Sequence, residues 1–284
     1  MNHLESISNG LGAQSMLLCV LACRGEIPAT VSITGDTGWE SDRTCSDGRK
    51  MTSEQYFDEV AAPLCQRGGI QARFVRSRDV NKNHLPSLIS HLEKCAANGI
   101  KPNIPMFGSR GGRLRQVCTD KWKIRALRQE ARRMGAKTNR NAQGIHYGEA
   151  FRRVRGNFLG MDGRWSIYQT TVKVKGEWKP VKWQTHYYPL VDLKLTRESV
   201  QELLRKEGIP YLLSSECDGC PHKDPARWKR TSPEIIAELA RIESLFAGEL
   251  FFTDKRIPLL EAIKEMESNG QEPDFGCSNF ICGV

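Results

Sequence analysis

Five of the ten cysteines in this 284-residue sequence have a spacing or a setting that could support metal or sulfur chemistry. They are Cys118, Cys217, Cys220, Cys277 and Cys282. Cys217 and Cys220 form a Cys-x-x-Cys pair, the spacing at which two thiolates can bind one metal ion or cluster. The other five cysteines stand singly and are expected to be ordinary core or surface residues. Because no basic and apolar signal segment opens the sequence, we expect a cytoplasmic protein whose cysteines do not form disulfides.

A second candidate site is the stretch "SISNGLGAQSMLL", residues 6–18, where small residues separate a short apolar strand from a helical run. The first amides of a helix attract anions, and glycines allow phosphate oxygens to approach the backbone. Ser8, Gly10, Gly12 and Ser15 therefore form a candidate phosphate-binding loop. The stretch fits neither the GxGxxG nor the GxxxxGKS/T pattern, so an ordinary tight turn is the alternative.

The charge balance favours an anionic partner. The sequence has 42 Lys and Arg against 33 Asp and Glu, a formal net charge of +9, and the excess is concentrated in residues 110–155. Such a basic field suits a nucleotide or a nucleic acid, although a solvated basic face would give the same composition. No apolar stretch reaches about 18 residues, so a membrane is not an expected partner.

The elements that must position these residues alternate between strand and helix, the pattern of an α/β fold with a twisted parallel sheet sandwiched by helices. We expect strands over 4–8, 29–38 and 70–75 and helices over 13–24, 50–66 and 84–98. A basic segment over 100–140, a hairpin over 163–188 and a helix between Thr196 and Gly208 follow. We expect a nucleotide-binding domain over 1–212 and a Cys-rich helical region over 213–284, with helices near 232–246 and 256–268.

Five segments resemble, in the same order, the motifs of the PP-loop superfamily of adenine nucleotide alpha-hydrolases. "SNGLGAQS" is similar to its SGGxDS loop, "TGDTGWE" to its DTG motif, and "GIHYGEAFRRVRG" to its GIRxxES segment. "YPLVDLKLTRESVQELLRKEGIPY" is similar to the PLxDW segment, and "SSECDGCPHKDPARW" to the GCxxCP loop of phosphoadenosine phosphosulfate (PAPS) reductase-like proteins. The chain is therefore identified as a member of the PAPS reductase-like family, in a branch of phage and bacterial proteins with a GAxQS loop.

The resemblance implies a nucleotide site. Ser8, Gly10, Gly12, Gln14 and Ser15 would bind the phosphates. Gln14 replaces the acidic residue of the family loop, so Asp36 would have to hold any Mg²⁺. Thr37 and Gly38 would approach the nucleotide, and Arg152 and Arg155 would clamp a phosphate. Lys121 and Lys123 would supply positive charge to the leaving pyrophosphate.

The segment "QVCTDKWK" resembles the CTxxxK segment of family members that carry an iron–sulfur cluster. We therefore expect a 4Fe-4S cluster on Cys118, Cys217, Cys220 and either Cys277 or Cys282. The remaining C-terminal cysteine, with Cys282 the better candidate, would be a nucleophile or sulfur carrier. A structural zinc site, with His222 as a further ligand, is the alternative.

These expectations imply an enzyme that binds ATP, adenylates an acceptor and supports sulfur transfer with a sulfur donor or reductant protein. The acceptor would be a nucleic acid or nucleobase, for which the aromatic residues Trp165, Tyr168, Trp178 and Trp183 are suited. One alternative is a reductase of PAPS or adenosine phosphosulfate (APS), in which a C-terminal cysteine attacks sulfur. The sequence ends "FICGV" and keeps only Cys-Gly of the ECGLH tail of true PAPS reductases. The other alternative is a non-catalytic module that senses nucleotides or binds nucleic acid.

Overall fold

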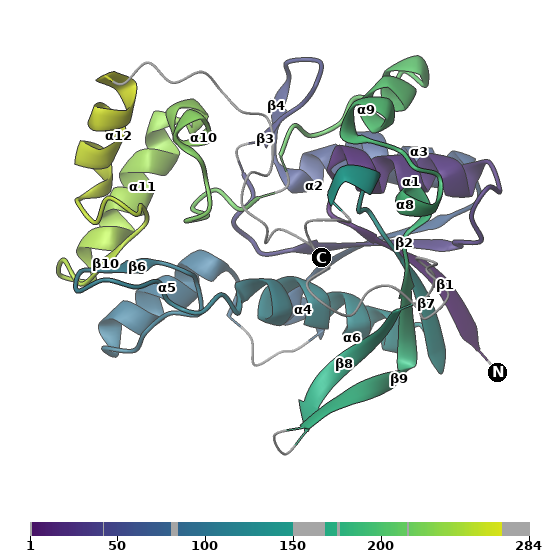
Figure 1. Ribbon diagram of the computed structural model, residues 1–284, viewed down its shortest axis with the longest axis horizontal. Coiled ribbons are helices and arrows are strands. Elements are labelled where there is room, and N and C mark those ends of the chain that lie inside the picture. Colours follow the sequence, from purple (N-terminus) through teal and green to yellow (C-terminus); the bar gives the residue numbers. More distant parts are fainter. Residues whose placement is uncertain are drawn as a thin grey trace.

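The structure is a computed structural model that describes residues 2–41, 43–80, 85–149, 168–174, 177–214 and 216–268. Its centre is a six-stranded sheet in the order β5-β2-β1-β7-β9-β8 (Figure 1). The strands are β1 His3–Asn9, β2 Val31–Asp36, β5 Gln71–Arg76, β7 Thr138–Gln143, β8 Tyr168–Val174 and β9 Glu177–Tyr187. The first five strands in that spatial order are parallel, and β8 pairs antiparallel with β9. The chain therefore has the predicted α/β fold with a parallel sheet.

Helices cover both faces of this sheet (Figure 1). One face carries α1 Ala13–Cys23, α3 Ala62–Arg67, α8 Pro189–Asp192 and α9 Arg197–Lys206. The other face carries α4 Ser77–Val80 and α6 Arg125–Arg133. Among the described residues, none of the helices has both the length and the apolar character needed to cross a membrane.

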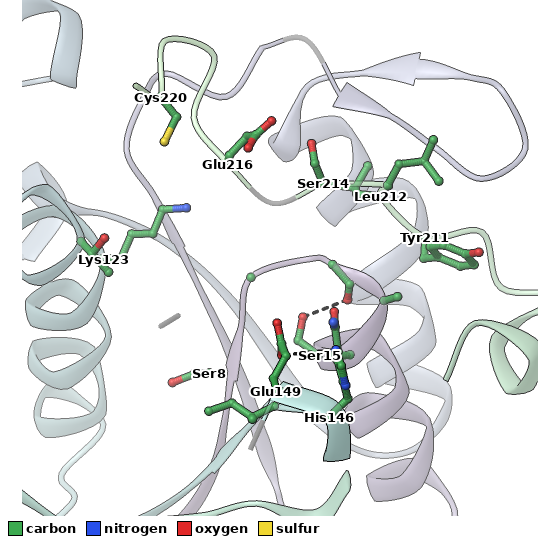
Figure 2. A pocket seen from close by; sticks show the side chains of 18 of the residues that line it. Ser8, Ser15, Lys123, His146, Glu149, Tyr211, Leu212, Ser214, Glu216 and Cys220 are labelled. Atoms are coloured by element: carbon green, nitrogen blue, oxygen red, sulfur yellow. Dashed lines mark hydrogen bonds and ion pairs between the residues drawn. The ribbon is translucent and has the colours of Figure 1, made fainter. Parts of the chain in front are cut away.

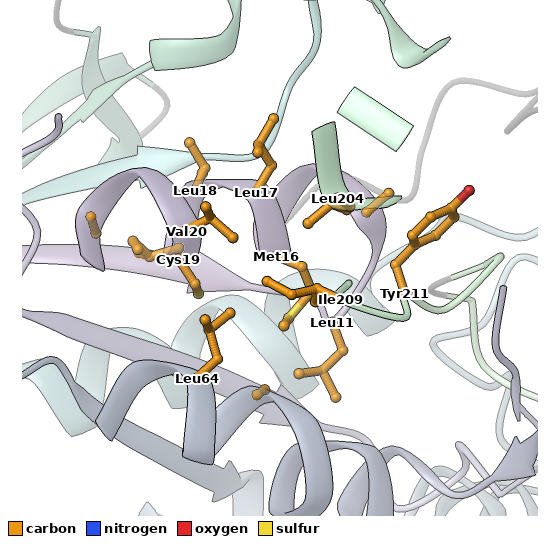
Figure 3. Close-up of a cluster of buried hydrophobic side chains, with 14 of the residues drawn as sticks. Leu11, Met16, Leu17, Leu18, Cys19, Val20, Leu64, Leu204, Ile209 and Tyr211 are labelled. Atoms are coloured by element: carbon orange, nitrogen blue, oxygen red, sulfur yellow. The ribbon is translucent and has the colours of Figure 1, made fainter. Parts of the chain in front are cut away.

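The largest hydrophobic cluster lies between the sheet and α1. Nine of the eleven residues of α1 are buried, which is typical of a helix enclosed on all sides by the core. Leu17 and Leu18 of α1 belong to the same cluster as Ile7 of β1, Leu64 of α3 and Leu204 of α9 (Figure 3). This packing fixes the position of the first turn of α1, and with it the loop that precedes the helix.

A second hydrophobic cluster lies beside the sheet. Its helices are α5 Leu88–Ala97, α10 Pro225–Arg230, α11 Pro233–Ser244 and α12 Leu259–Ser268, with β6 Phe107–Gly108 paired to β10 Leu250–Phe251. Trp39, Trp122 and Trp228 are buried in this cluster. The cluster unites residues from both sides of the domain boundary expected at residue 212.

Residues 50–66 differ from the single helix that was expected. They begin as β4 Lys50–Met51, which pairs with β3 Arg43–Thr44, and become helical only in α2 Ser53–Tyr56. Thr52 Oγ1 accepts a hydrogen bond from the Gln55 amide, and Gln55 Oε1 accepts one from the Thr52 amide. This capping box fixes the start of the helix. A π-helical stretch, η1 Phe57–Ala61, then leads into α3.

Strand β7 was not expected, because its sequence, "TNRNAQ", lacks the apolar alternation of a buried strand. Its buried side chains are mostly polar, and they pair with polar side chains of the neighbouring strands β1 and β9. We call this set the polar ladder. It consists of Ser6, Ser8, Asn139, Asn141, Gln143, Gln184 and His186.

Candidate functional site

A pocket lies at the carboxyl ends of β1 and β7. Numbered along the chain, the five parallel strands have the spatial order 3-2-1-4-5, so their connections reverse direction between β1 and β7. The crevice at such a switch point is where doubly wound sheets bind ligands. The pocket has a volume of about 140 Å³ (Figure 2). The loop after β1 and the turn after β7 form one wall, and residues of the 116–123 and 211–220 segments form the other.

The loop after β1 is held in an open turn by its own side chains. Leu11 has φ +61°, a conformation that few residues other than glycine adopt. Its amide donates to Asn9 Oδ1 at 2.8 Å, and its side chain is buried in the cluster around α1. Gly12 then caps α1 without a side-chain hydrogen bond. Among the described residues, no side chain caps the first amides of α1, so these amides are suited to bind an anion.

The residues around this helix start leave space and favour negative charge. The first turn of α1 contains no acidic residue that would compete with an anion. Gly144, directly after β7, packs against the same turn, and a Cβ atom at this position would lie 2.9 Å from the Ser15 nitrogen. Of the expected phosphate-binding residues, Ser8, Gly10, Gly12, Gln14 and Ser15 all line the pocket. Gly144 was not named as a candidate residue. It directly follows β7, and the polar sequence of this strand does not reveal where the strand ends.

The hydroxyl group of Ser8 belongs to the polar ladder. Ser8 Oγ donates to Asn141 Oδ1 at 2.8 Å and accepts from Gln143 Nε2 at 3.2 Å. Because its only hydrogen is used by Asn141, the hydroxyl offers the pocket an acceptor and not a donor. In this arrangement the backbone amides, and not this hydroxyl, are the groups suited to bind a phosphate.

The far end of the polar ladder is His186. Gln143 Nε2 lies 2.9 Å from His186 Nδ1, and Gln184 Nε2 lies 3.3 Å from His186 Nε2. Burial, together with the positive charge of Arg128, lowers the pKa of His186 to about 4. The ladder is therefore an uncharged network at neutral pH.

Three of the five candidate cysteines line the opposite wall of the pocket. They are Cys118, Cys217 and Cys220. Cys217 Sγ lies 3.4 Å from Thr37 Oγ1 and 3.6 Å from Glu40 Oε1. Burial raises the pKa of the Cys217 thiol well above its usual value, although Lys123 opposes the shift, so this thiol is protonated in the structure described.

A buried charge cluster stands behind Cys217. Lys123 Nζ lies 2.6 Å from Glu40 Oε1, and an Arg43 guanidinium nitrogen lies 3.2 Å from Glu40 Oε2. Burial alone would raise the pKa of Glu40, but Lys123 and Arg43 outweigh it and lower that pKa. Conversely, the negative charge of Glu40 outweighs burial and raises the pKa of Lys123. All three groups are therefore ionised and fix one another.

Lys123 lines the pocket, whereas Lys121, the expected catalytic lysine, is not among the lining residues. Both belong to the π-helix η2 Thr119–Ile124, and the Lys121 carbonyl accepts a hydrogen bond from Ser77 Oγ. Both lysines were expected to supply positive charge, and of the two Lys123 is the one that faces the pocket.

The motif after β2 supports the pocket wall without lining it. Asp36 forms an ion pair with Arg76, with a separation of 3.2 Å between Oδ2 and Nε. Burial and the nearby Glu40 raise the Asp36 pKa. Thr37 contacts Glu40 and Cys217, and Gly38 has φ +68° and packs against Ser87. The role of Asp36 as a Mg²⁺ ligand stays a prediction.

Among the residues that the structure describes, no three His, Cys, Asp or Glu side chains are grouped closely enough to hold a metal ion. Cys118, Cys217 and Cys220 share a wall but do not form a closed ligand set. The other expected site residues, Arg152, Arg155, Cys277 and Cys282, lie outside the described residues, as does Trp165. The iron–sulfur cluster and the zinc alternative both stay predictions.

The pocket also contains residues that were not named as candidate site residues, although three of them lie in the quoted segments 144–156 and 188–211. His146 and Glu149 follow β7, with 3.7 Å between Nε2 and Oε2 (Figure 2). Arg197 lines the pocket from the start of α9, and Leu212 pairs with Gly12 of the loop. The fold brings these segments together at one pocket.

Comparison with protein-family models and with curated proteins gives no match for this chain.

Proposed function

We propose that this protein is a PP-loop-type enzyme that binds an adenine nucleotide, adenylates an acceptor and carries out sulfur chemistry at its cysteines. One observation carries this proposal. A single pocket at the switch point of the sheet has the start of α1 on one wall and Cys118, Cys217 and Cys220 on the other. A phosphate group held at the helix start would place the rest of the nucleotide between the two walls.

The protein's own groups would act by position and by charge. The acceptor oxygen attacks the α-phosphorus of ATP, the bond to the bridging oxygen breaks, and pyrophosphate leaves. The loop amides hold the phosphates, while Lys123 and Arg197 supply positive charge from opposite sides of the pocket. Mg²⁺, when bound, would add charge of the same kind. Asp36, the expected Mg²⁺ ligand, has one carboxylate oxygen in the ion pair with Arg76 and is not among the lining residues.

The proposed sulfur chemistry is tested by anaerobic purification followed by iron, sulfide and zinc analysis. The test includes alanine variants of Cys118, Cys217, Cys220, Cys277 and Cys282. A 4Fe-4S cluster lost in four of the five variants supports the proposal and leaves the fifth cysteine as the sulfur carrier. One equivalent of zinc would indicate instead that these cysteines form a structural zinc site.

The nucleotide site is tested with Gly144→Ala. Its Cβ would lie 2.9 Å from the Ser15 nitrogen, and we expect ATP affinity to fall by about tenfold or more because the anion loses charge-assisted contacts to the loop amides. The matched control is Gly148→Ala, whose Cβ meets only the movable His146 ring, at 3.2 Å. Binding is measured by isothermal titration calorimetry, and pyrophosphate release is measured with nucleic-acid acceptors. Equal affinities in the two variants would contradict the proposed phosphate site.

A sulfonucleotide reductase is the second candidate, and the thiols on the pocket wall favour it. An attacking thiolate would form a bond to the sulfur of PAPS or APS, the sulfur–oxygen bond to the phosphate would break, and adenosine bisphosphate or AMP would leave. The resulting sulfonated cysteine is detected by mass spectrometry. No adduct and no sulfite would exclude this reading. If ATP binds but no acceptor leads to pyrophosphate release from it, the result would instead favour a non-catalytic nucleotide-binding module.

A further inference from the structure

We propose that a second cavity, next to the main pocket, is a binding site for a tetrahedral oxyanion, a phosphate or sulfate group. The cavity has a volume of about 70 Å³, which exceeds the space that a single water needs. Three basic residues line it, Lys223, Arg227 and Arg230, together with one acidic residue, Glu216. None of its basic residues has been given a role in the proposed reaction, although Arg227 also lines the main pocket.

Arg227 forms the rigid side of the cavity. Its side chain is 93% buried, with 7% of its surface exposed. Arg227 Nη1 lies 2.7 Å from Glu216 Oε2, and its Nε lies 3.2 Å from Asp224 Oδ2. These two carboxylates fix the position of the guanidinium.

Lys223 supplies the charge that remains available. Its Nζ donates to Thr231 Oγ1 at 2.7 Å and lies 5.2 Å from the centre of the Trp228 ring. Among the described residues no carboxylate lies within ion-pair distance of this Nζ, although an ammonium group has three hydrogens to donate. Burial lowers the Lys223 pKa, although the nearby Glu216 and Asp218 oppose this shift. A bound oxyanion would add negative charge directly at this ammonium group.

The position of the cavity connects it to the main pocket. Leu213, Ser214, Glu216 and Arg227 line both spaces, so only one segment of chain separates them. An anion in the second cavity and a nucleotide at the loop would therefore lie on opposite sides of this segment. The geometry suits a phosphate group carried by the second substrate or by a distant part of the same ligand.

The test uses the full-length protein and tungstate, a tetrahedral oxyanion that anomalous diffraction locates in soaked crystals. We expect one peak at the loop and a second peak in the cavity beside Lys223. Lys223→Met keeps the apolar stem over Trp228 and removes the charge, so the second peak should disappear while the first remains. Lys229→Met, on α10 and outside the lining, is the control and should keep both peaks.

The same variants are titrated with inorganic phosphate in solution. We expect Lys223→Met to weaken the second-site affinity by about tenfold or more, the usual effect of losing one charged hydrogen bond. Gly144→Ala should remove only the loop peak, so failure of the nucleotide site and failure of this site give different results. The absence of tungstate from the cavity in the wild-type protein, at concentrations that fill the loop, would overturn the proposal.

Competition distinguishes the sources of the anion. Displacement of tungstate from the cavity by a short single-stranded oligonucleotide assigns the site to a phosphodiester of a nucleic acid. Displacement by a nucleoside bisphosphate alone assigns it to a phosphomonoester of a small nucleotide. If neither the oligonucleotide nor the nucleoside bisphosphate displaces tungstate, the ligand of the cavity is the free inorganic anion.

Discussion

At the scale of single residues, the difference between Lys121 and Lys123 shows what a sequence motif leaves open. Two residues that are two positions apart on a helix point to nearly opposite sides, so only one of them can face a given pocket. Here η2 turns Lys123 toward the pocket, where Glu40 holds it. The rotation of a helix depends on what packs against it, and no local pattern reveals it. A motif therefore locates a charge to within one turn but does not identify the residue.

His186 should make the stability of the protein depend on pH. Its pKa is about 4 in the folded protein, against about 6.5 for an unperturbed histidine. Between these values the unfolded chain binds a proton that the folded chain does not, so the free energy of unfolding falls as the pH drops through this window. We expect His186 to account for a loss of up to about 2 kcal/mol between pH 7.5 and 5.

The measurement is urea unfolding of the wild type and of His186→Asn at several pH values. The variant should lose the part of the pH dependence that His186 causes, so the two stability curves should converge at low pH. Curves that stay parallel from pH 7.5 to 5 would show that His186 is not held neutral by its surroundings.

At the scale of elements, the apolar strands and the capped helices could be predicted, and the polar strand could not. β1, β2 and β5 have apolar alternation or runs, and Thr196 caps α9 through the Ser199 amide as expected. β7 contributes Asn139, Asn141 and Gln143 to the sheet, a composition that local pattern assigns to a loop. Their burial is stable only because β1 and β9 supply matching partners, and such pairing across the fold is not readable from one segment.

Asn141→Val tests this explanation of β7. Valine has the higher strand propensity, yet it would remove the donor to Ser6 Oγ and the acceptor for Ser8 Oγ. We expect a loss of about 2 to 4 kcal/mol in the free energy of unfolding. Thr138→Val, at the more exposed start of the same strand, is the control and should change stability by less than about 1 kcal/mol. A stabilised Asn141→Val variant would show that the polar ladder is not needed for β7 to form.

At the scale of the whole molecule, the candidate site could be predicted only in part because it lies where two hydrophobic clusters meet. The loop at residues 8–15 depends on the cluster around α1, and the cysteine wall depends on the cluster around α5 and α11. Trp39 packs in the second cluster, and the next residue, Glu40, binds Lys123 at the pocket. The residues of each wall could be predicted from the sequence. Their position opposite one another could not, because it depends on packing between segments that are far apart in the chain.

Gly219→Ala tests the junction between the pocket wall and the second cluster. A Cβ atom at residue 219 would overlap the Trp39 ring and the Leu239 side chain. We expect a loss of about 2 to 3 kcal/mol in stability, together with weaker nucleotide binding, because Trp39 must move. Gly35→Ala, whose Cβ has no neighbour closer than 3.4 Å, should cost less than about 1 kcal/mol and serves as the control. Unfolding is followed by near-ultraviolet circular dichroism. Equal losses in the two variants would contradict a junction at Gly219.

The left-handed conformation of Leu11 also determines how a ligand would meet the loop. Its buried side chain and the Asn9 amide hold this conformation before any anion arrives. The conformational entropy of the loop is therefore lost when the protein folds and not when a ligand binds. The loop is preorganised, so little of the ligand's interaction energy is used to shape its own binding site.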